Sequence, residues 1–258
     1  MKIASWNINS IRARIDNLQE WLKANPVDFL FLQEIKAQEE NFPYDDVKAM
    51  GYNAIIKGQK SYNGVAILTK HDEDDLSNIE TTLLGDDSDD QARFISLDYK
   101  GTKLINIYLP NGNGGDEKYA YKLKWMDRLY NLAKDLRNEE KDFLIAGDYN
   151  VIPTSADCYS EAAWIDDALY MLPTRQAFRK LENLGLYDAF RINNAEPHQY
   201  TFWDYQAGRW QKDEGIRIDH FLLSPKLTDK LKSCDIDREP RGKEKASDHT
   251  PIIIDLED

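Results

Sequence analysis

The sequence is poor in cysteine and has no long hydrophobic run. Its two cysteines, Cys158 and Cys234, are far apart and show no CxxC or Cys/His spacing, so neither a disulfide framework nor a zinc site is indicated. No apolar run approaches the roughly 20 residues that a membrane helix needs. The first ten residues lack the apolar core of a signal peptide. We therefore expect reduced thiols, no membrane association and a cytoplasmic location.

Positive charge is also scarce relative to negative charge. The chain carries 33 Lys and Arg against 46 Asp and Glu, a formal net charge of -13. Because sequence-independent binding of a polyanion depends on cations that neutralise phosphates, this balance argues against indiscriminate binding to nucleic acid. Any nucleic-acid surface must be local. Basic residues near the motifs described below could form such a stripe: Arg12, Arg14, Lys60, Arg209, Arg241, Lys243 and Lys245.

Short predicted strands recur along the whole chain. They occupy residues 2–6, 27–32, 64–69, 93–99, 103–109, 142–146, 216–223 and 251–256. Apolar residues at helical spacing predict helices near 11–22, 123–136 and 174–184. Strands outnumber helices and often follow one another directly, which favours two packed sheets flanked by helices over a doubly wound parallel sheet. The length suits a single domain over residues 1–258.

Polar residues repeatedly fall at the ends of these predicted strands. They are Asn7, Glu34, Asp148 with Asn150, Asp219 with His220, and Asp248 with His249. Carboxylates gathered at one rim repel each other and resist desolvation, so such a cluster needs a cation or a proton. Carboxylate and amide oxygens favour Mg²⁺ or Mn²⁺ over zinc. Taken singly, each residue also has a simpler interpretation as part of a turn, a strand cap or a surface loop.

The ordered combination of motifs is more specific than any one of them. The motifs are Trp6-Asn7-Ile8-Asn9, Leu32-Gln33-Glu34, Gly147-Asp148-Tyr149-Asn150, Arg217-Ile218-Asp219-His220 and Ser247-Asp248-His249. Together they resemble the endonuclease/exonuclease/phosphatase superfamily. Two further motifs are similar to those of bacterial exonuclease III-type apurinic/apyrimidinic endonucleases: Tyr108-Leu109-Pro110-Asn111-Gly112 and Phe202-Trp203-Asp204-Tyr205.

This resemblance implies a fold and a set of site residues. The fold is of the α/β class, a DNase I-like four-layer α/β sandwich in which two mixed β-sheets pack face to face between helices. The implied metal ligands are Asn7, Glu34 and Asp248, joined by Asp148, Asn150 and His249 if a second metal binds. The implied catalytic residues are Tyr108, Asp148, Asn150, Asp219 and His249. The implied DNA contacts are Arg93, Asn111, Phe202, Trp203 and His249.

The resemblance also implies roles for these side chains. Asp148 matches a carboxylate that orients or deprotonates the attacking water, and Asn150 matches a donor to the pentacovalent phosphate. His249 contacts the scissile phosphate or assists proton transfer, while Asp219 fixes its tautomer. Tyr108 donates to a phosphate oxygen or to the leaving oxyanion. The adjacent aromatic pair in the Phe202 motif matches an apolar wall that receives a baseless sugar.

The implied activity is hydrolysis of the phosphodiester 5′ to an abasic site in duplex DNA. The cofactor would be Mg²⁺, with Mn²⁺ able to substitute, and 3′–5′ exonuclease and 3′-end-cleaning activities would accompany incision. The expected partner is double-stranded DNA with abasic sites or blocked 3′ ends, bound by a monomer. Two alternatives stay open. One is a phosphodiesterase or phosphatase of the same superfamily acting on lipid or inositol phosphates, although no amphipathic basic membrane helix stands out. The other is a catalytically silent DNA-binding module.

Overall fold

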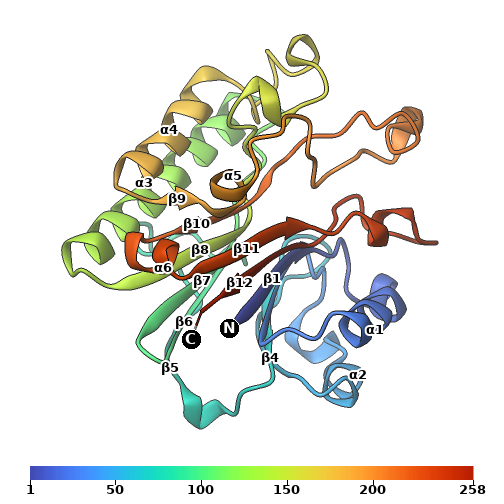
Figure 1. Cartoon of the computed structure of the whole chain (residues 1–258), viewed down its shortest axis with the longest axis vertical. Coiled ribbons are helices and arrows are strands. Elements are labelled where there is room, and N and C mark those ends of the chain that lie inside the picture. Colours follow the sequence, from blue (N-terminus) through green and yellow to red (C-terminus); the bar gives the residue numbers. More distant parts are fainter. Residues whose placement is uncertain (258) are drawn as a thin grey trace.

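Two six-stranded mixed sheets form the centre of the computed structural model, which describes residues 1–257 (Figure 1). In sheet order, the first contains β11 (Leu231–Ile236), β12 (Ile252–Leu256), β1 (Lys2–Asn7), β2 (Phe29–Gln33), β4 (Val65–Thr69) and β3 (Asn53–Lys57). The second contains β5 (Leu76–Glu80), β6 (Phe94–Tyr99), β7 (Thr102–Tyr108), β8 (Asp142–Asp148), β10 (Asp219–Leu223) and β9 (Tyr187–Asp188). Both parallel and antiparallel pairs occur in each sheet.

Helices cover the outer face of each sheet (Figure 1). The first sheet is covered by α1 (Ile15–Ala24) and α2 (Tyr44–Ala49), and the second by α3 (Asp116–Asn138) and α4 (Leu172–Asn183). Two short helices, α5 (Ala189–Asn193) and α6 (Pro225–Asp229), follow β9 and β10. The 3-10 helices are η1 (Arg12–Arg14), η2 (Glu39–Asn41), η3 (Glu73–Asp75), η4 (Ser155–Asp157), η5 (Glu161–Ala163), η6 (Gln206–Gly208) and η7 (Glu239–Gly242). The predicted four-layer sandwich is therefore confirmed.

The alternation of side chains along each strand explains this layering. In β2, Phe29 and Phe31 point into the core between the two sheets, whereas Leu30 and Leu32 join the cluster beneath the outer helices. Both faces of the strand are buried, which is why its sequence is a continuous apolar run. Among residues 1–257, no helix is both long and apolar enough to cross a bilayer.

A polar network crosses the core between the sheets. The Gln33 side-chain amide donates to Asn106 Oδ1 at 2.7 Å and to Ser5 Oγ at 3.1 Å. The Asn106 amide in turn donates to the carbonyl oxygens of Leu32, at 3.1 Å, and Ala66, at 2.8 Å. All these groups are buried. Because unsatisfied buried polar groups are costly, sliding one sheet against the other is penalised and the register of the sandwich is fixed.

Strand direction brings the predicted polar residues to one edge of the sandwich. β1 runs parallel to β2, and β7 runs parallel to β8 with Tyr108 opposite Asp148. β10 runs antiparallel to β8, so its first residue, Asp219, also lies opposite Asp148. Gly147 permits this close pairing, since its φ is +143° and a Cβ there would lie 1.9 Å from the Ile107 carbonyl oxygen. A side chain at this position would force the two strands apart.

The structure also differs from the sequence-based elements in places. The predicted strand over 216–223 begins only at Asp219, because Ile216 forms isolated bridges with Cys158 and Phe202 instead. The short or irregular strands β3, β5, β9 and β11 were not predicted. Both thiols are free and buried, and burial raises the pKa of Cys158 to about 11.

A buried ion cluster supports the segment that leads into β10. Arg217 is fully buried, with Nε 2.7 Å from Asp157 Oδ1 and Nη1 2.8 Å from Asp188 Oδ2. Burial and the adjacent guanidinium lower the pKa of His220 to about 4. The neutral ring accepts from Arg217 at 3.0 Å and donates to the Val151 carbonyl at 2.9 Å. His220 therefore has a structural environment.

We predict that Arg217→Met destabilises the protein by about 3–5 kcal/mol, because it leaves buried carboxylates without their main partner. Urea unfolding monitored by tryptophan fluorescence measures this loss. The partly exposed pair between Arg209 and Glu214 supplies the control. Arg209→Met should cost less than about 1 kcal/mol. If both variants lost the same free energy of unfolding, the buried cluster would contribute no more to stability than the partly exposed pair, which would contradict the prediction.

Candidate active site

The Asn7 side chain joins carboxylates from the two sheets. It lies at the end of β1, is fully buried, and donates from Nδ2 to Glu34 Oε1 and to Asp148 Oδ2, both at 3.0 Å. Glu34 follows β2 directly, and Asp148 ends β8. The two sheets therefore present their acidic residues to one shared point on the rim.

The backbone at this rim adopts an unusual conformation. Asn9, Glu34 and Asn150 have φ values of 46°, 50° and 47°. Residues other than glycine rarely occupy this left-handed region, and such strain clusters at functional sites where the surrounding structure holds it. Here the turns redirect side chains at the ends of strands toward the rim.

Glu34 is surrounded by donors. Tyr108 donates its phenolic proton to Oε1 at 2.8 Å, and Lys36 Nζ lies 2.8 Å from Oε2. Burial opposes ionisation of Glu34, but the hydrogen bonds from Asn7 and Lys36 outweigh it and lower its pKa. Burial and the nearby carboxylates raise the pKa of Tyr108 well above its usual value. The site thus holds an anionic glutamate beside a protonated phenol.

His249 lies between two aspartates. Its Nδ1 is 2.8 Å from Asp219 Oδ2, and its Nε2 is 3.7 Å from Asp148 Oδ2. Burial disfavours the imidazolium, but the carboxylates of Asp219 and Asp148 outweigh it and raise the pKa of His249 to about 10. Burial, offset in part by His249, raises the pKa of Asp148 to about 7. The cluster can therefore both donate and accept protons near neutral pH.

The donors at the rim suit a hard divalent cation. Ligand atoms of Asp148, Asp219 and His249 lie within 4.8 Å of one another, and Asp219 Oδ1 is buried without a hydrogen-bond partner among residues 1–257. Glu34, beside Asn7, supplies a second group of oxygen ligands, as hard cations prefer. In this structure Tyr108 and Asn7 bond to Glu34 Oε1 and Lys36 contacts Oε2, so a cation at Glu34 would take the place of one of these donors.

Asp248 lies slightly apart from this group. Its Oδ1 accepts from the Asn9 side-chain amide at 2.9 Å. Asn9 Oδ1 accepts from Lys36 Nζ at 2.6 Å, which links Asp248 to the donors around Glu34. Of the predicted metal ligands, the structure thus brings Asn7 and Glu34 into direct contact and connects Asp248 through Asn9.

Asn150 and Asn111 form the floor of the site beside Asp148. The Asn111 amide donates to Asn150 Oδ1 at 3.1 Å, and the Asn150 amide donates to the Leu109 carbonyl at 2.9 Å. The backbone N–H of Asn150 donates to Asp148 Oδ1 at 2.8 Å. Arg93 stacks over the Tyr108 ring at 4.8 Å. These predicted residues are therefore assembled in one place.

The predicted aromatic wall divides into two environments. The Phe202 ring lies 4.9 Å from the His249 ring and is partly exposed. Trp203 is fully buried, 4.9 Å from the Trp210 ring, and donates to Asp213 at 3.1 Å. A cavity of about 250 Å³ adjoins Phe202 and is lined also by Tyr159, Trp164, Arg209 and Ile216. Of these two rings, that of Phe202 contacts His249, whereas that of Trp203 packs against Trp210 in the interior.

Two lysines at the site were not predicted from the sequence. Lys36 contacts Glu34, and Lys122 reaches the loops around Asn111 and Asn150 from α3. Burial lowers the pKa of Lys122 to about 7. The signal for Lys36 was its position two residues beyond a strand-end carboxylate. No comparable signal marked Lys122, because a lysine within a helix is usually exposed.

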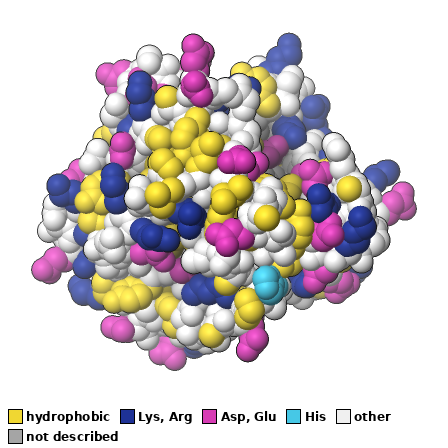
Figure 2. Space-filling model, turned by 90° about the horizontal axis from the view of Figure 1, so that it is seen from above, with side chains coloured by type: hydrophobic (Ala, Val, Ile, Leu, Met, Phe, Trp, Pro, Cys, Tyr) yellow, Lys and Arg dark blue, Asp and Glu magenta, His cyan; other side chains and the backbone are white. Residues whose placement is uncertain are grey.

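The expected basic stripe is smaller in the structure than in the sequence. Arg241 is buried and donates to the Trp203 carbonyl at 2.9 Å. Arg209 pairs with Glu214, and Lys243 pairs with Glu20 and Glu239. Figure 2 shows one face on which cationic and anionic side chains are interspersed. Arg12, Lys60, Lys243 and Lys245 are the exposed members of the predicted stripe.

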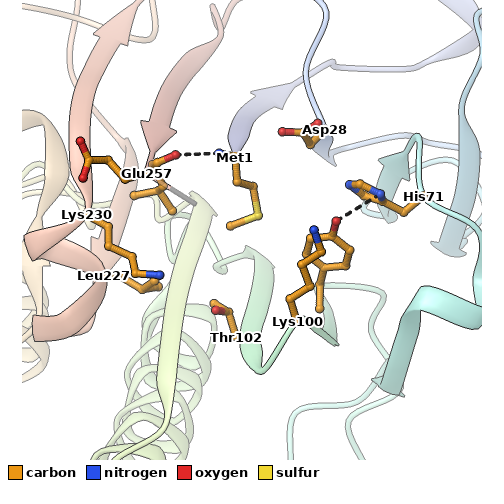
Figure 3. A pocket seen from close by; sticks show the side chains of 10 residues that line it. Met1, Asp28, His71, Lys100, Thr102, Leu227, Lys230 and Glu257 are labelled. Carbon is orange, nitrogen blue, oxygen red and sulfur yellow. Dashed lines mark hydrogen bonds between the residues drawn. The ribbon is translucent and has the colours of Figure 1, made fainter.

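A separate cavity of about 330 Å³ opens at the opposite ends of the strands (Figure 3). Its lining includes Met1, Asp28, His71 and Lys100, and His71 Nδ1 lies 3.3 Å from the Tyr99 hydroxyl. β1 and β7 begin near this cavity and end at the carboxylate rim. None of its lining residues belongs to the predicted site.

Comparison with known proteins shows the family of the chain. The chain is 32% identical to the exodeoxyribonuclease III of Haemophilus influenzae over 98% of each chain. A structure of the 3′ phosphatase NExo from Neisseria bound to product DNA hairpin matches with a TM-score of 0.95 and 34% identity, covering 100% of this chain and 99% of that one. An AP endonuclease from Archaeoglobus fulgidus matches with a TM-score of 0.92 and 33% identity over 100% of each chain. Residues 4–249 match the endonuclease/exonuclease/phosphatase family, to which this chain belongs.

Proposed function

We propose that this protein is a divalent-metal-dependent DNA repair nuclease. It hydrolyses the phosphodiester 5′ to abasic sites in duplex DNA, and it also removes nucleotides and blocking groups from 3′ ends. The observation that carries this proposal is the contact of Asn7 with both Glu34 and Asp148, beside the pair of His249 and Asp219. The DNA-directed activities in the names of its relatives favour DNA over a lipid or inositol phosphate.

The proposed cofactor is Mg²⁺, held by Glu34 with Asn7 and Asp248 close by. Divalent-metal dependence is common to the family, and oxygen ligands suit this ion, with Mn²⁺ able to replace it. When bound, the metal neutralises charge that develops on a phosphate oxygen. Lys36 would then exchange its contact with Glu34 for solvent or DNA.

In the proposed mechanism, Asp148 orients the attacking water and accepts its proton. Its two oxygens are fixed by the backbone N–H of Asn150 and the side-chain amide of Asn7. A pKa near neutrality lets a carboxylate both accept and release a proton. His249, held by Asp219, donates to the phosphate, while Asn150 and Tyr108 donate to oxygens on which charge accumulates.

Substrate selection would depend on access to the rim. A nucleotide inside a duplex must be extruded to reach it, and extrusion costs least where base stacking is already missing. Phe202 borders both the His249 ring and the 250 Å³ cavity, so it is placed to contact an extruded sugar. Trp203, which was also expected to line the wall, would support Phe202 from the interior.

The decisive experiment uses a 5′-labelled duplex with a single abasic analogue. Incision 5′ to the lesion should require Mg²⁺ and stop with EDTA, and Asp148→Asn should bind the duplex but cleave it by orders of magnitude more slowly. Glu34→Ala should need a higher metal concentration, because it removes an anionic ligand. Absence of any DNA cleavage with Mg²⁺ or Mn²⁺, by wild-type protein that hydrolyses inositol phosphates, would overturn the proposal.

The pairing of His249 with Asp219 predicts strong coupling between them. His249→Asn and Asp219→Ala should each be severely impaired, and the double variant should lose much less than the sum, because one residue acts through the other. Single-turnover rates on the same duplex measure the cycle. Additive losses would show that the two side chains act independently.

Phe202→Ala should lower abasic-site incision more than 3′-end processing, because the apolar wall holds an extruded sugar whereas a 3′ end reaches the rim without extrusion. Both activities are measured on the same preparations. Tyr187→Ala is the matched control, since Tyr187 is an exposed aromatic residue on β9. Trp203→Ala should lower the free energy of unfolding by about 3–5 kcal/mol. Equal losses of both activities in Phe202→Ala would argue for a purely structural ring.

A further inference from the structure

Lys122 is a buried lysine without a carboxylate partner at hydrogen-bond distance among residues 1–257. It lies in α3, where Trp125 and Leu129 pack onto the second sheet, and its relative exposure is 0%. Its Nζ donates to the carbonyl oxygens of Asn111, at 2.9 Å, and Asn150, at 2.6 Å. Burying an amine is costly unless its hydrogen bonds are satisfied. The two backbone carbonyls satisfy it here, which raises the question of what this buried lysine does.

The two carbonyls belong to different loops of the rim. Asn111 follows β7, and Asn150 follows β8. The side chains of these residues bond to each other at 3.1 Å, and the Asn150 N–H bonds to Asp148. Lys122 therefore connects the backbones of two residues whose side chains are already linked. The result is a closed ring of hydrogen bonds beside Asp148.

The loop that contains Gly112 leaves room for the aliphatic part of the Lys122 side chain. At Gly112, φ is +90° and a Cβ would lie 2.6 Å from Lys122 Cδ and 3.2 Å from Ala168 Cβ. Any side chain at this position would push the stem away from the two carbonyls. A neutral amine has two N–H groups and an ammonium has three, so either form can serve both acceptors.

We propose that Lys122 is a positioning residue that sets the separation of the Asn111 and Asn150 loops and thereby the placement of the Asn150 amide on the phosphate. This role rests on the proposed nuclease function. Lys122 does not itself reach the rim, since its Nζ is occupied by the backbone behind the two asparagines. Misplacement of a site group by about 1 Å can lower a rate by about 100-fold, so a backbone anchor can matter as much as a group that contacts substrate.

The test compares Lys122→Met with Lys103→Met. Methionine keeps most of the apolar stem and removes the donors. Lys103 is a second buried lysine, at the start of β7, and pairs with Glu80 and Asp98 at the end of the sandwich away from the rim. Both variants should lose thermal stability. Only Lys122→Met should lower kcat, by about 10- to 100-fold, with KM for a 3′-phosphate duplex little changed.

Two further measurements separate positioning from a general loss of structure. A double-mutant cycle with Asn150→Ala should be strongly non-additive, because Lys122 acts through that loop. Hydrogen–deuterium exchange should quicken over 109–113 and 149–151 in Lys122→Met but not in Lys103→Met. Unchanged kcat, additive losses, or unchanged exchange in these segments would overturn the proposal. Because exchange is measured without substrate, it reports on Lys122 even if wild-type protein proves inactive on DNA.

Discussion

The contact of Asn7 with two carboxylates is the constraint on which the site depends. One amide group donates to Glu34 from the first sheet and to Asp148 from the second. Without such a donor, two buried acidic groups at the meeting point of the sheets would repel each other and resist desolvation. Because the amide has two N–H groups, it can bond both carboxylates, while Lys36 contacts the other oxygen of Glu34 and the Asn150 N–H donates to the other oxygen of Asp148.

Protonated groups also separate the other carboxylates of the rim. Tyr108 stays protonated against Glu34, and His249 carries a proton between Asp148 and Asp219. Neighbouring carboxylates therefore have different partners: lysine, phenol and amide on one side, and imidazolium on the other. In the proposed mechanism, this difference in environment would allow residues of one chemical type to perform separate tasks, as metal ligand and as proton acceptor.

Much of this arrangement could be predicted from where polar residues interrupt the strands. Asn7, Glu34 and Asp148 lie at or just after the ends of strands, and Asp219 begins one. Parallel pairing of β1 with β2 and antiparallel pairing of β8 with β10 bring these positions to one edge. The motif pattern then led to the four-layer sandwich, which is confirmed. The assigned roles of the individual residues stay predictions, since geometry alone does not measure catalysis.

The errors and omissions have physical causes. Phe202 and Trp203 were predicted to line one wall, but the Trp203 ring is fully buried because adjacent residues of an extended segment point to opposite sides. Lys36 was missed because it follows a left-handed turn, with φ of 50° at Glu34 and again at Lys36, which strand periodicity cannot reveal. Lys122 was missed because its partners are backbone carbonyls, and a sequence shows only side chains.

The pairing of β1 with β12 has a consequence for how activity arises. β1 lies between β2 and β12, and Trp6 on β1 donates to the His249 carbonyl across 243 positions of sequence. During synthesis, the cluster that includes residues 7 and 34 can therefore assemble only after residues 219 to 249 have left the ribosome. A chain that ends before Asp219 and His249 therefore lacks the imidazole and one carboxylate of the cluster. The topology thus makes assembly of the rim a late event, which depends on synthesis of nearly the whole chain.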